Sequence, residues 1–226
     1  MTKRLFCFWT GDNKMPPNRV AALNTLSKTG LEIVFITKDN IDEWIIKEYK
    51  LHHSYENLSA VHRADYLRVY FMHHYGGGYC DIKNNKISWI DAYDDLYREN
   101  KLAVGYPEIG WKGVAMVGGF EYLKLILNSR KLIGNCAYIF KPKTEFTTEW
   151  YEKTNKLLDV LAPTLKENPA TDPEDFYGKK KDGEVSKYPL KWSQLLGDIF
   201  HPLCYKFRNE IIRTLPRPDF LSDYDH

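Results

Sequence analysis

The chain has 226 residues, of which 43% are apolar and 27% charged, enough to bury a substantial core in one large domain or two small ones. Its 32 basic and 30 acidic side chains nearly balance, so we expect no general nucleic-acid-binding surface. Aromatic residues make up 15% of the chain, more than a minimal core requires. We expect most of them in the core and some as stacking surfaces for sugars or bases.

The cysteines and the apolar runs indicate where the protein resides. Four widely separated cysteines, none in a Cys-x-x-Cys pair, predict buried thiols in a reducing compartment. They are Cys7, Cys80, Cys136 and Cys204. The apolar run at residues 5–9 is too short for a signal peptide, and no run approaches the roughly 18 residues of a membrane span. We therefore expect a cytoplasmic protein without a transmembrane segment, and the sequence is also compatible with part of a longer multidomain polypeptide.

The first fifty residues alternate between strand and helix patterns. The nearly continuous apolar run at 4–9 predicts a strand buried on both faces, and a second such strand is predicted at 31–37. Two prolines open a predicted helix that runs to residue 27, and Asn40 could cap another helix at 41–49. This order predicts an α/β protein whose parallel sheet is covered by helices.

The strongest predicted helix spans residues 58–75 and stops at Gly76. Further strands are predicted at 102–105, 114–117 and 137–140, and further helices at 90–100, 121–127 and 145–161. Residues 168–190 contain few apolar side chains and predict a long surface loop, either mobile filler or a lid. No linker divides the chain, so we expect one domain over residues 1–226.

One constellation carries chemistry. Asp65 and Arg68 are three residues apart and share a face of the predicted helix. The glycines that follow it let the backbone turn sharply, and a short strand then delivers Asp81 at its end. A carboxylate in that place can hold a divalent cation that bridges a diphosphate. An ion pair or a helix stop is ordinary alone, but the two in this order indicate a functional site.

Two histidine pairs have simpler explanations. His73 and His74 end a predicted helix, where the helix dipole favours an imidazolium. His52 and His53 have no Cys or His at zinc spacing, so we expect both to be solvated.

The sequence resembles a known family at these motifs. Residues 63–68 (Arg-Ala-Asp-Tyr-Leu-Arg) and 75–81 (Tyr-Gly-Gly-Gly-Tyr-Cys-Asp) are similar to the signature of nucleotide-sugar glycosyltransferases with a DxD motif. That group comprises capsular polysaccharide synthesis and mannosyltransferase-like proteins of the GT-A fold. Weaker similarity is present at 8–11 and 133–142, so the resemblance spans roughly residues 4–160.

The resemblance implies a fold and an activity. The fold would be GT-A, a Rossmann-like, mainly parallel central sheet with helices on both faces and the donor at the carboxyl ends of the strands. Residues 1–105 would form the nucleotide-sugar-binding part, and 106–226 the acceptor-side and C-terminal part. The activity would be transfer of a sugar from a UDP or GDP donor to a glycan or other hydroxyl acceptor in polysaccharide biosynthesis. It would use Mn²⁺ or Mg²⁺ and retain the anomeric configuration.

The resemblance also implies roles for individual residues. Those expected to bind the nucleotide sugar are Phe8, Trp9, Thr10, Thr37, Lys38, Asp39, Arg63, Asp65 and Lys83. Asp81 matches the first Asp of the family's pair, so the metal ligands would be Asp81 and His201. The catalytic groups would be Asp81, Asp65 and Glu108. Of these, Glu108 lies on a turn-rich loop beside Trp111 and would contact the acceptor.

The DxD motif itself is altered. The sequence reads Asp81-Ile82-Lys83, so a cation replaces the second carboxylate. Asp81 could bind metal with help from Asn84, Asn85 or His201. Alternatively, Lys83 could supply positive charge to the diphosphate directly. A third possibility is that the chain binds the donor but transfers sugar poorly.

Other function classes stay open at this point. They are a sugar-nucleotide-binding module, a sugar-phosphate nucleotidyltransferase and a lectin-like glycan binder. The sequence has no Gly-x-Gly-x-x-Gly after a strand and no P-loop, which argues against dinucleotide oxidoreductases and P-loop enzymes.

Overall fold

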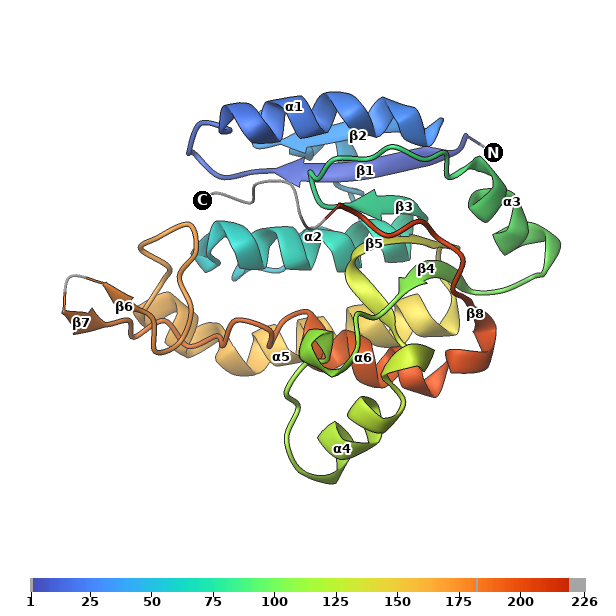
Figure 1. Ribbon diagram of the computed structural model, residues 1–226. Helices are drawn as coiled ribbons and strands as arrows, with labels where there is room; N and C mark the ends of the chain where they lie inside the picture. The colour runs from blue at the N-terminus through green and yellow to red at the C-terminus, as the bar shows by residue number, and fades with distance from the viewer. Residues whose placement is uncertain (1, 182, 220–226) are drawn as a thin grey trace.

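The computed structural model describes residues 2–181 and 183–219, and its centre is one twisted sheet (Figure 1). The strand order is β2-β1-β3-β5-β4-β8. The strands are β1 (Arg4–Trp9), β2 (Glu32–Thr37), β3 (Gly77–Cys80), β4 (Ala103–Pro107), β5 (Ile133–Phe140) and β8 (Ile211–Ile212). β1 pairs in parallel with β2 and β3, and β4 with β8, whereas β5 runs antiparallel to β3 and β4. The predicted α/β class with a mainly parallel, Rossmann-like sheet is confirmed.

Helices cover both faces of the sheet, as Figure 1 shows. One face is covered by α1 (Pro17–Thr25) and α3 (Ile90–Arg98). The other is covered by α2 (Ala60–His74), α5 (Glu145–Glu167) and α6 (Gly197–Lys206). Two smaller elements stand outside these layers: α4 (Gly119–Leu127), and a hairpin of β6 (Lys180–Lys181) and β7 (Glu184–Val185). Both chain parts, before and after residue 105, contribute strands to the single sheet.

The two-sided cover explains the continuous apolar run of β1. Phe6 and Phe8 point to the face covered by α2, and Leu5 and Cys7 point to the face covered by α1. Because successive side chains of a strand alternate between faces, a strand buried on both sides needs an apolar residue at every position. The predicted strand at 4–9 is therefore confirmed.

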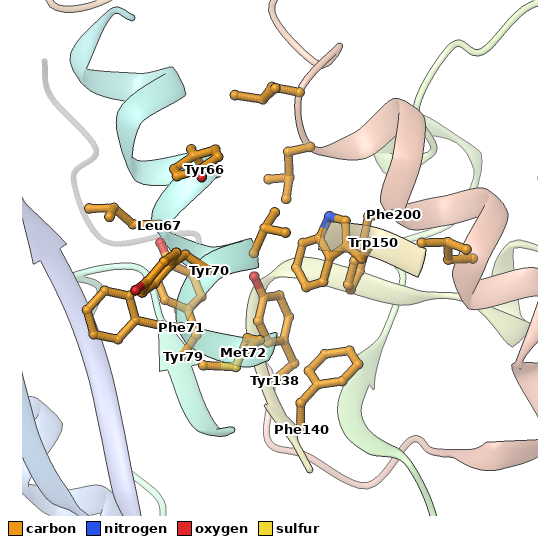
Figure 2. Close-up of a cluster of buried hydrophobic side chains, with 14 of the residues drawn as sticks. Tyr66, Leu67, Tyr70, Phe71, Met72, Tyr79, Tyr138, Phe140, Trp150 and Phe200 are labelled. Carbon is orange, nitrogen blue, oxygen red and sulfur yellow. The ribbon is translucent and has the colours of Figure 1, made fainter. Parts of the chain in front are cut away.

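Aromatic rings fill the larger of the two cores. In Figure 2, Tyr138 and Phe140 of β5 lie against Trp150 and Phe200 of the covering helices. The ring centroids of Trp150 and Phe200 are 4.8 Å apart, and those of Tyr138 and Phe200 are 5.3 Å apart. The expectation that aromatic residues serve mainly as core is met here, since these four side chains are fully buried.

The turn from α2 to β3 depends on glycine. α2 is flanked by the cap residues Ser59 and Tyr75, after which Gly76 and Gly77 have φ angles of +63° and +89°. A Cβ on Gly76 would lie 2.5 Å from Pro142 Cδ and 2.8 Å from the carbonyl oxygen of Phe140. The chain can therefore make this turn against β5 only without a side chain at position 76.

Two predicted elements are wrong. Residues 41–49 form only a 3₁₀ turn at Ile41–Trp44, because tyrosine hydroxyls of α2 take the backbone groups that a helix would use. Tyr70 Oη accepts from the N–H of Ile46 and donates to the carbonyl of Tyr49. The predicted strand at 114–117 is an irregular segment, since the N–H of Ala115 donates to His201 Nδ1 rather than to a neighbouring strand.

Other elements differ in length or were not foreseen. β5 starts at Ile133, four residues before the predicted strand, and α5 continues to Glu167 past an internal proline. α6 and β8 were not predicted; α6 contains Pro202, a residue that usually argues against a helix interior. The segment 168–190 is largely irregular as predicted, but its last part is buried through Tyr188 and Leu190.

Replacing Gly76 with alanine should destabilise the protein more than the same change at Gly178. Both glycines have positive φ, which costs a Cβ about 1 kcal/mol, but Gly178 has no atom within 4 Å of an added Cβ. The clash with Pro142 and Phe140 should add about 1–3 kcal/mol at Gly76. Urea unfolding measures both losses. Equal losses would show that the turn tolerates a side chain.

Candidate functional site

The ends of three parallel strands bring the predicted donor residues to one edge of the sheet. β1 lies between β2 and β3, and its last residue Trp9 pairs with Thr37 of β2. The segments that follow these strands, with Thr10, Lys38 and Asp81, therefore leave the sheet on the same side.

Arg68 is the centre of this edge. Its guanidinium lies 3.2 Å from Asp81 Oδ1 and 3.6 Å from Asp65 Oδ1, and it donates to the carbonyl of Asn135 at 3.2 Å. It also lies over the ring of Tyr79, 4.6 Å from the centroid. A single side chain of α2 thus connects the ends of β3 and β5, and it joins Asp65 and Asp81.

Asp81 is held from several directions. Its Oδ1 accepts a hydrogen bond of 2.6 Å from Tyr79 Oη, and its backbone N–H donates to the carbonyl of Cys136. Burial raises the pKa of Tyr79, so the phenol stays protonated and remains a donor. These contacts fix the direction of the Asp81 carboxylate.

Asp65 is buried and only 3% exposed. Burial raises the pKa of its carboxyl group to about 7, although the Arg68 charge lowers it, and the Asp81 charge raises it further. Near neutral pH the carboxyl group of Asp65 therefore exchanges between its neutral and charged forms.

Sequence reasoning placed Arg68 beside Asp65 without assigning it a binding or catalytic role, and it did not relate Tyr79 to Asp81. Both carried a signal: Arg68 is one helical turn after Asp65, and Tyr79 is two residues before Asp81 on a strand, which places the two side chains on one face. Asn135 and Cys136 lie in the weakly similar segment 133–142, but no spacing relates them to Asp81, because they come from a strand more than fifty residues later.

Charged side chains line the outer part of the same edge. Lys38 Nζ lies 2.5 Å from Asp12 Oδ1, and both side chains are exposed. The hydrogen bond and the charge of Lys38 lower the pKa of Asp12, and the more distant charge of Arg63 acts in the same direction. Arg63 itself pairs with Glu56 at 3.3 Å. Lys38 and Arg63, both predicted to bind the donor, thus act on a common carboxylate.

The three donor candidates at the end of β1 have different surroundings. Phe8 belongs to the core, where its ring stacks on Tyr79 with centroids 5.4 Å apart. Trp9 is half-buried on the opposite face and donates to the carbonyl of Asn13. Thr10 is buried.

The remaining donor candidates lie in turns after the strands. After β2, the N–H of Thr37 donates to Asn40 Oδ1, and the N–H of Asp39 donates to Thr37 Oγ1. After β3, Lys83 is buried and its N–H donates to the carbonyl of Asp81. Lys83 therefore lies in the turn that carries Asp81.

Glu108 and His201 meet each other. His201 Nε2 lies 3.3 Å from Glu108 Oε2, and both side chains are buried. His201 Nδ1 accepts the N–H of Ala115, so a neutral His201 carries its proton on Nε2, toward Glu108. Within the described part of the chain only Nδ1 of the ring makes a hydrogen bond, whereas Nε2 faces the Glu108 carboxylate without one. The Glu108 side chain is 6% exposed and thus largely shielded from solvent.

Oxygen atoms suited to a hard cation are present beside Arg68. Asn135 Oδ1 is buried and has no hydrogen-bond partner within the described part of the chain. Asn135 is also the residue whose carbonyl Arg68 holds next to Asp81. Carboxylate and amide oxygens are ligands that Mg²⁺ and Mn²⁺ accept, so Asp81 and Asn135 carry oxygen atoms of the right chemistry for such an ion.

A second group of metal-ligating side chains lies elsewhere. The ligand atoms of His52, His53 and Asp159 are all within 4.8 Å of one another. However, His52 Nδ1 accepts the N–H of Ser54, so its proton resides on Nε2, which faces Asp159 at 3.0 Å. This is a completed hydrogen-bonded pair. The expectation that His52 is solvated is wrong, since its side chain is 6% exposed.

A hollow of about 730 Å³ lies beside the amino end of α2. Asp172, Asp175, Lys179 and Tyr188 of the long loop contribute to its lining. Tyr188 attaches the loop to α2, because its Oη lies 3.1 Å from Nδ1 of His62. The hollow is thus on the side of the molecule where the parallel strands end.

The first part of the chain matches a known protein family. The family model for capsular polysaccharide synthesis proteins matches residues 1–83. The matched segment contains β1, β2, α2 and β3, together with Asp65, Arg68 and Asp81. No curated protein matches the chain. Among the described helices, none has the length and apolar character needed to cross a bilayer. The amino-terminal third is therefore similar to capsule-synthesis proteins of a glycosyltransferase-like kind.

The Asp65→Asn variant should gain stability relative to the wild type as the pH rises. Because the folded pKa of Asp65 is raised to about 7, the folded protein holds a proton that the unfolded chain releases above about pH 4. The wild type thus loses stability between about pH 4 and 7, and an asparagine cannot. Thermal unfolding in a chelator should show the difference in Tm, variant minus wild type, increasing from pH 5 to pH 8.

The matched control is Asp91→Asn, at an exposed carboxylate. Its difference in Tm should stay flat over the same range. A flat difference for Asp65→Asn as well would contradict the raised pKa.

Proposed function

We propose that this protein is a glycosyltransferase of the GT-A type that moves a sugar from a UDP or GDP donor to a hydroxyl of a glycan acceptor. The observation that carries the proposal is the Asp65–Arg68–Asp81 cluster, which lies at the carboxyl edge of parallel strands. The similarity of residues 1–83 to capsular polysaccharide synthesis proteins supports it. Four free cysteines are compatible with action in the cytoplasm.

The donor would lie across the ends of β1, β2 and β3. Lys38 and Arg63 provide positive charge at the exposed edge, where a diphosphate is most easily reached. Trp9 is the last residue of β1 and Thr10 follows it; they would offer a ring and a hydroxyl group to the nucleotide. Crevices outside the carboxyl ends of strands are the usual ligand sites of open α/β sheets.

Asp81 and Asn135 would hold a divalent cation, Mn²⁺ or Mg²⁺. When bound, such an ion stabilises the negative charge of the departing diphosphate. Tyr79 and Arg68 contact Asp81 through Oδ1, so we assign Oδ2 to the cation. Lys83 lies in the same turn and would add its charge to the diphosphate.

Asp65 and Arg68 act from beneath the site. Arg68 keeps the Asp81 carboxylate in one orientation, which is the preorganisation that catalysis requires. The carboxyl group of Asp65, whose pKa is close to neutral pH, would accept a hydrogen bond from a sugar hydroxyl when charged and donate one when protonated. Glu108 and His201 join the loop after β4 to α6 and would shape the acceptor side.

The acceptor would enter the hollow beside α2. Its lining combines carboxylates, two lysines and a tyrosine, groups that hydrogen-bond sugar hydroxyls. The long loop that forms it corresponds to the lid considered from the sequence.

One observation favours a second candidate, a nucleotide-sugar-binding module without transfer. Asp81 already contacts the positive charge of Arg68, and Lys83 occupies the place of the second carboxylate. Both features reduce the negative charge that would attract a cation.

Asp81→Asn separates these functions. With a panel of UDP and GDP sugars, we expect the wild type to be stabilised by one donor more strongly in Mn²⁺ than in chelator. We expect it to release nucleoside diphosphate, and the variant to lose roughly 100-fold in that rate. Thermal shift and diphosphate release are the measurements.

Asp91→Asn again serves as the matched control and should leave both readings unchanged. Donor stabilisation without diphosphate release, with or without Mn²⁺, would favour the binding module. Full activity of Asp81→Asn would remove Asp81 from the mechanism, and no stabilisation by any donor would overturn the proposed function.

A further inference from the structure

An unusual number of large apolar side chains is exposed in one stretch of the chain, residues 109–131. Phe120 is 81% exposed, Leu127 83% and Met116 78%. Ile109, Trp111 and Leu123 are also exposed. Single exposed apolar residues are common in proteins, but a group of six within some twenty residues indicates an interaction surface.

The helix α4 organises this surface. Phe120, Leu123 and Leu127 are spaced i, i+3 and i+7, so they form one stripe along the helix. The opposite stripe already has partners: Leu125 is fully buried, and Tyr122 and Ile126 pack against the core. α4 is thus fixed to the body by one face and presents the other to solvent. Figure 1 shows it at the periphery of the molecule, next to α6.

The loop before α4 continues the surface. Trp111 and Met116 precede the helix, and Gly118 has no atom within 4 Å of the position of a Cβ. The apolar stripe and the loop therefore form an open, projecting face rather than a groove that would enclose a peptide.

Basic residues accompany the apolar side chains. The stretch contains four basic residues, Lys112, Lys124, Arg130 and Lys131, and one acidic residue, Glu121. Glu121 pairs with Lys124 at 2.9 Å. Lys112 Nζ lies 5.8 Å from the ring of Trp111. Contacts between proteins generally disfavour lysine, whereas helices that lie in a membrane interface combine tryptophan, phenylalanine and leucine with lysine and arginine.

We propose that residues 109–131 dock this protein on an anionic lipid surface, with α4 lying in the plane of the interface. Phe120, Leu123 and Leu127 enter the boundary between head groups and acyl chains. Lys112, Arg130 and Lys131 stay at the level of the lipid phosphates. The proposal does not depend on the glycosyltransferase function, because it rests on the exposed side chains of this stretch and on none of the contacts that build the candidate site.

Vesicle flotation of the full chain tests the proposal. We expect binding to vesicles of phosphatidylcholine with 30% phosphatidylglycerol and at least tenfold weaker binding to phosphatidylcholine alone. Phe120→Ser with Leu127→Ser should reduce binding to the anionic vesicles by more than tenfold. Lys112→Gln with Arg130→Gln and Lys131→Gln should lower the affinity for anionic vesicles by roughly 100-fold and remove the lipid preference.

Val160→Ser is the matched control, at an apolar side chain of α5 that is 71% exposed. It should bind as the wild type does. All changes lie at exposed positions, and an unchanged Tm would establish that the variants are folded. Absence of wild-type binding to anionic vesicles, or equal binding by the serine variant, would overturn the proposal.

Sedimentation velocity tests the alternative partner for this surface, a second copy of the chain. The wild type should be monomeric in the absence of lipid. A dimer that the Phe120→Ser, Leu127→Ser variant dissociates, without vesicle binding by the wild type, would replace the lipid surface by self-association.

Discussion

A buried guanidinium holds the candidate site in place. The Arg68 side chain is 12% exposed and contacts two carboxylates and a backbone carbonyl. A charge in such surroundings is tolerated only when it is paired and hydrogen-bonded, and loss of one partner leaves it uncompensated. The positions of α2, β3 and β5 around Arg68 are therefore coupled, because a shift of one element would separate full charges from their partners.

This coupling gives Asp81 a double character. It is a structural partner of Arg68 and Tyr79, and in the proposed function it would also present an oxygen to the cation. A motif with two carboxylates would leave strong negative charge for a cation to neutralise. Here the positive charges of Lys83 and Arg68 offset that of Asp81, which in the proposed site would weaken the attraction for a cation and strengthen that for a diphosphate. The departure from Asp-x-Asp would thus favour binding of the diphosphate by basic side chains over binding through a cation.

The sequence predicts best what local patterns decide. The strand at 4–9 and the helix that contains Asp65 follow from apolar runs, caps and stops, and Asp81 follows from its place after a glycine turn. The predicted helix at 41–49 fails because two hydroxyl groups from later in the chain, of Tyr70 in α2 and of Tyr75 directly after it, bind its backbone groups. The pairing of Glu108 with His201 likewise joins residues 93 positions apart, which no spacing in the sequence reveals.

The antiparallel strand β5 has a consequence for how the chain folds. β3 pairs with β1 on one side and with β5 on the other, and β5 ends at Phe140. During synthesis the hydrogen-bonding edge of β3 thus stays open until some sixty further residues have followed it. Such late, non-local pairing slows folding and exposes a strand edge to other chains. The carbonyls of Asn135 and Cys136 arrive with β5, so the surroundings of Arg68 are complete only once the last inner strand has closed the sheet.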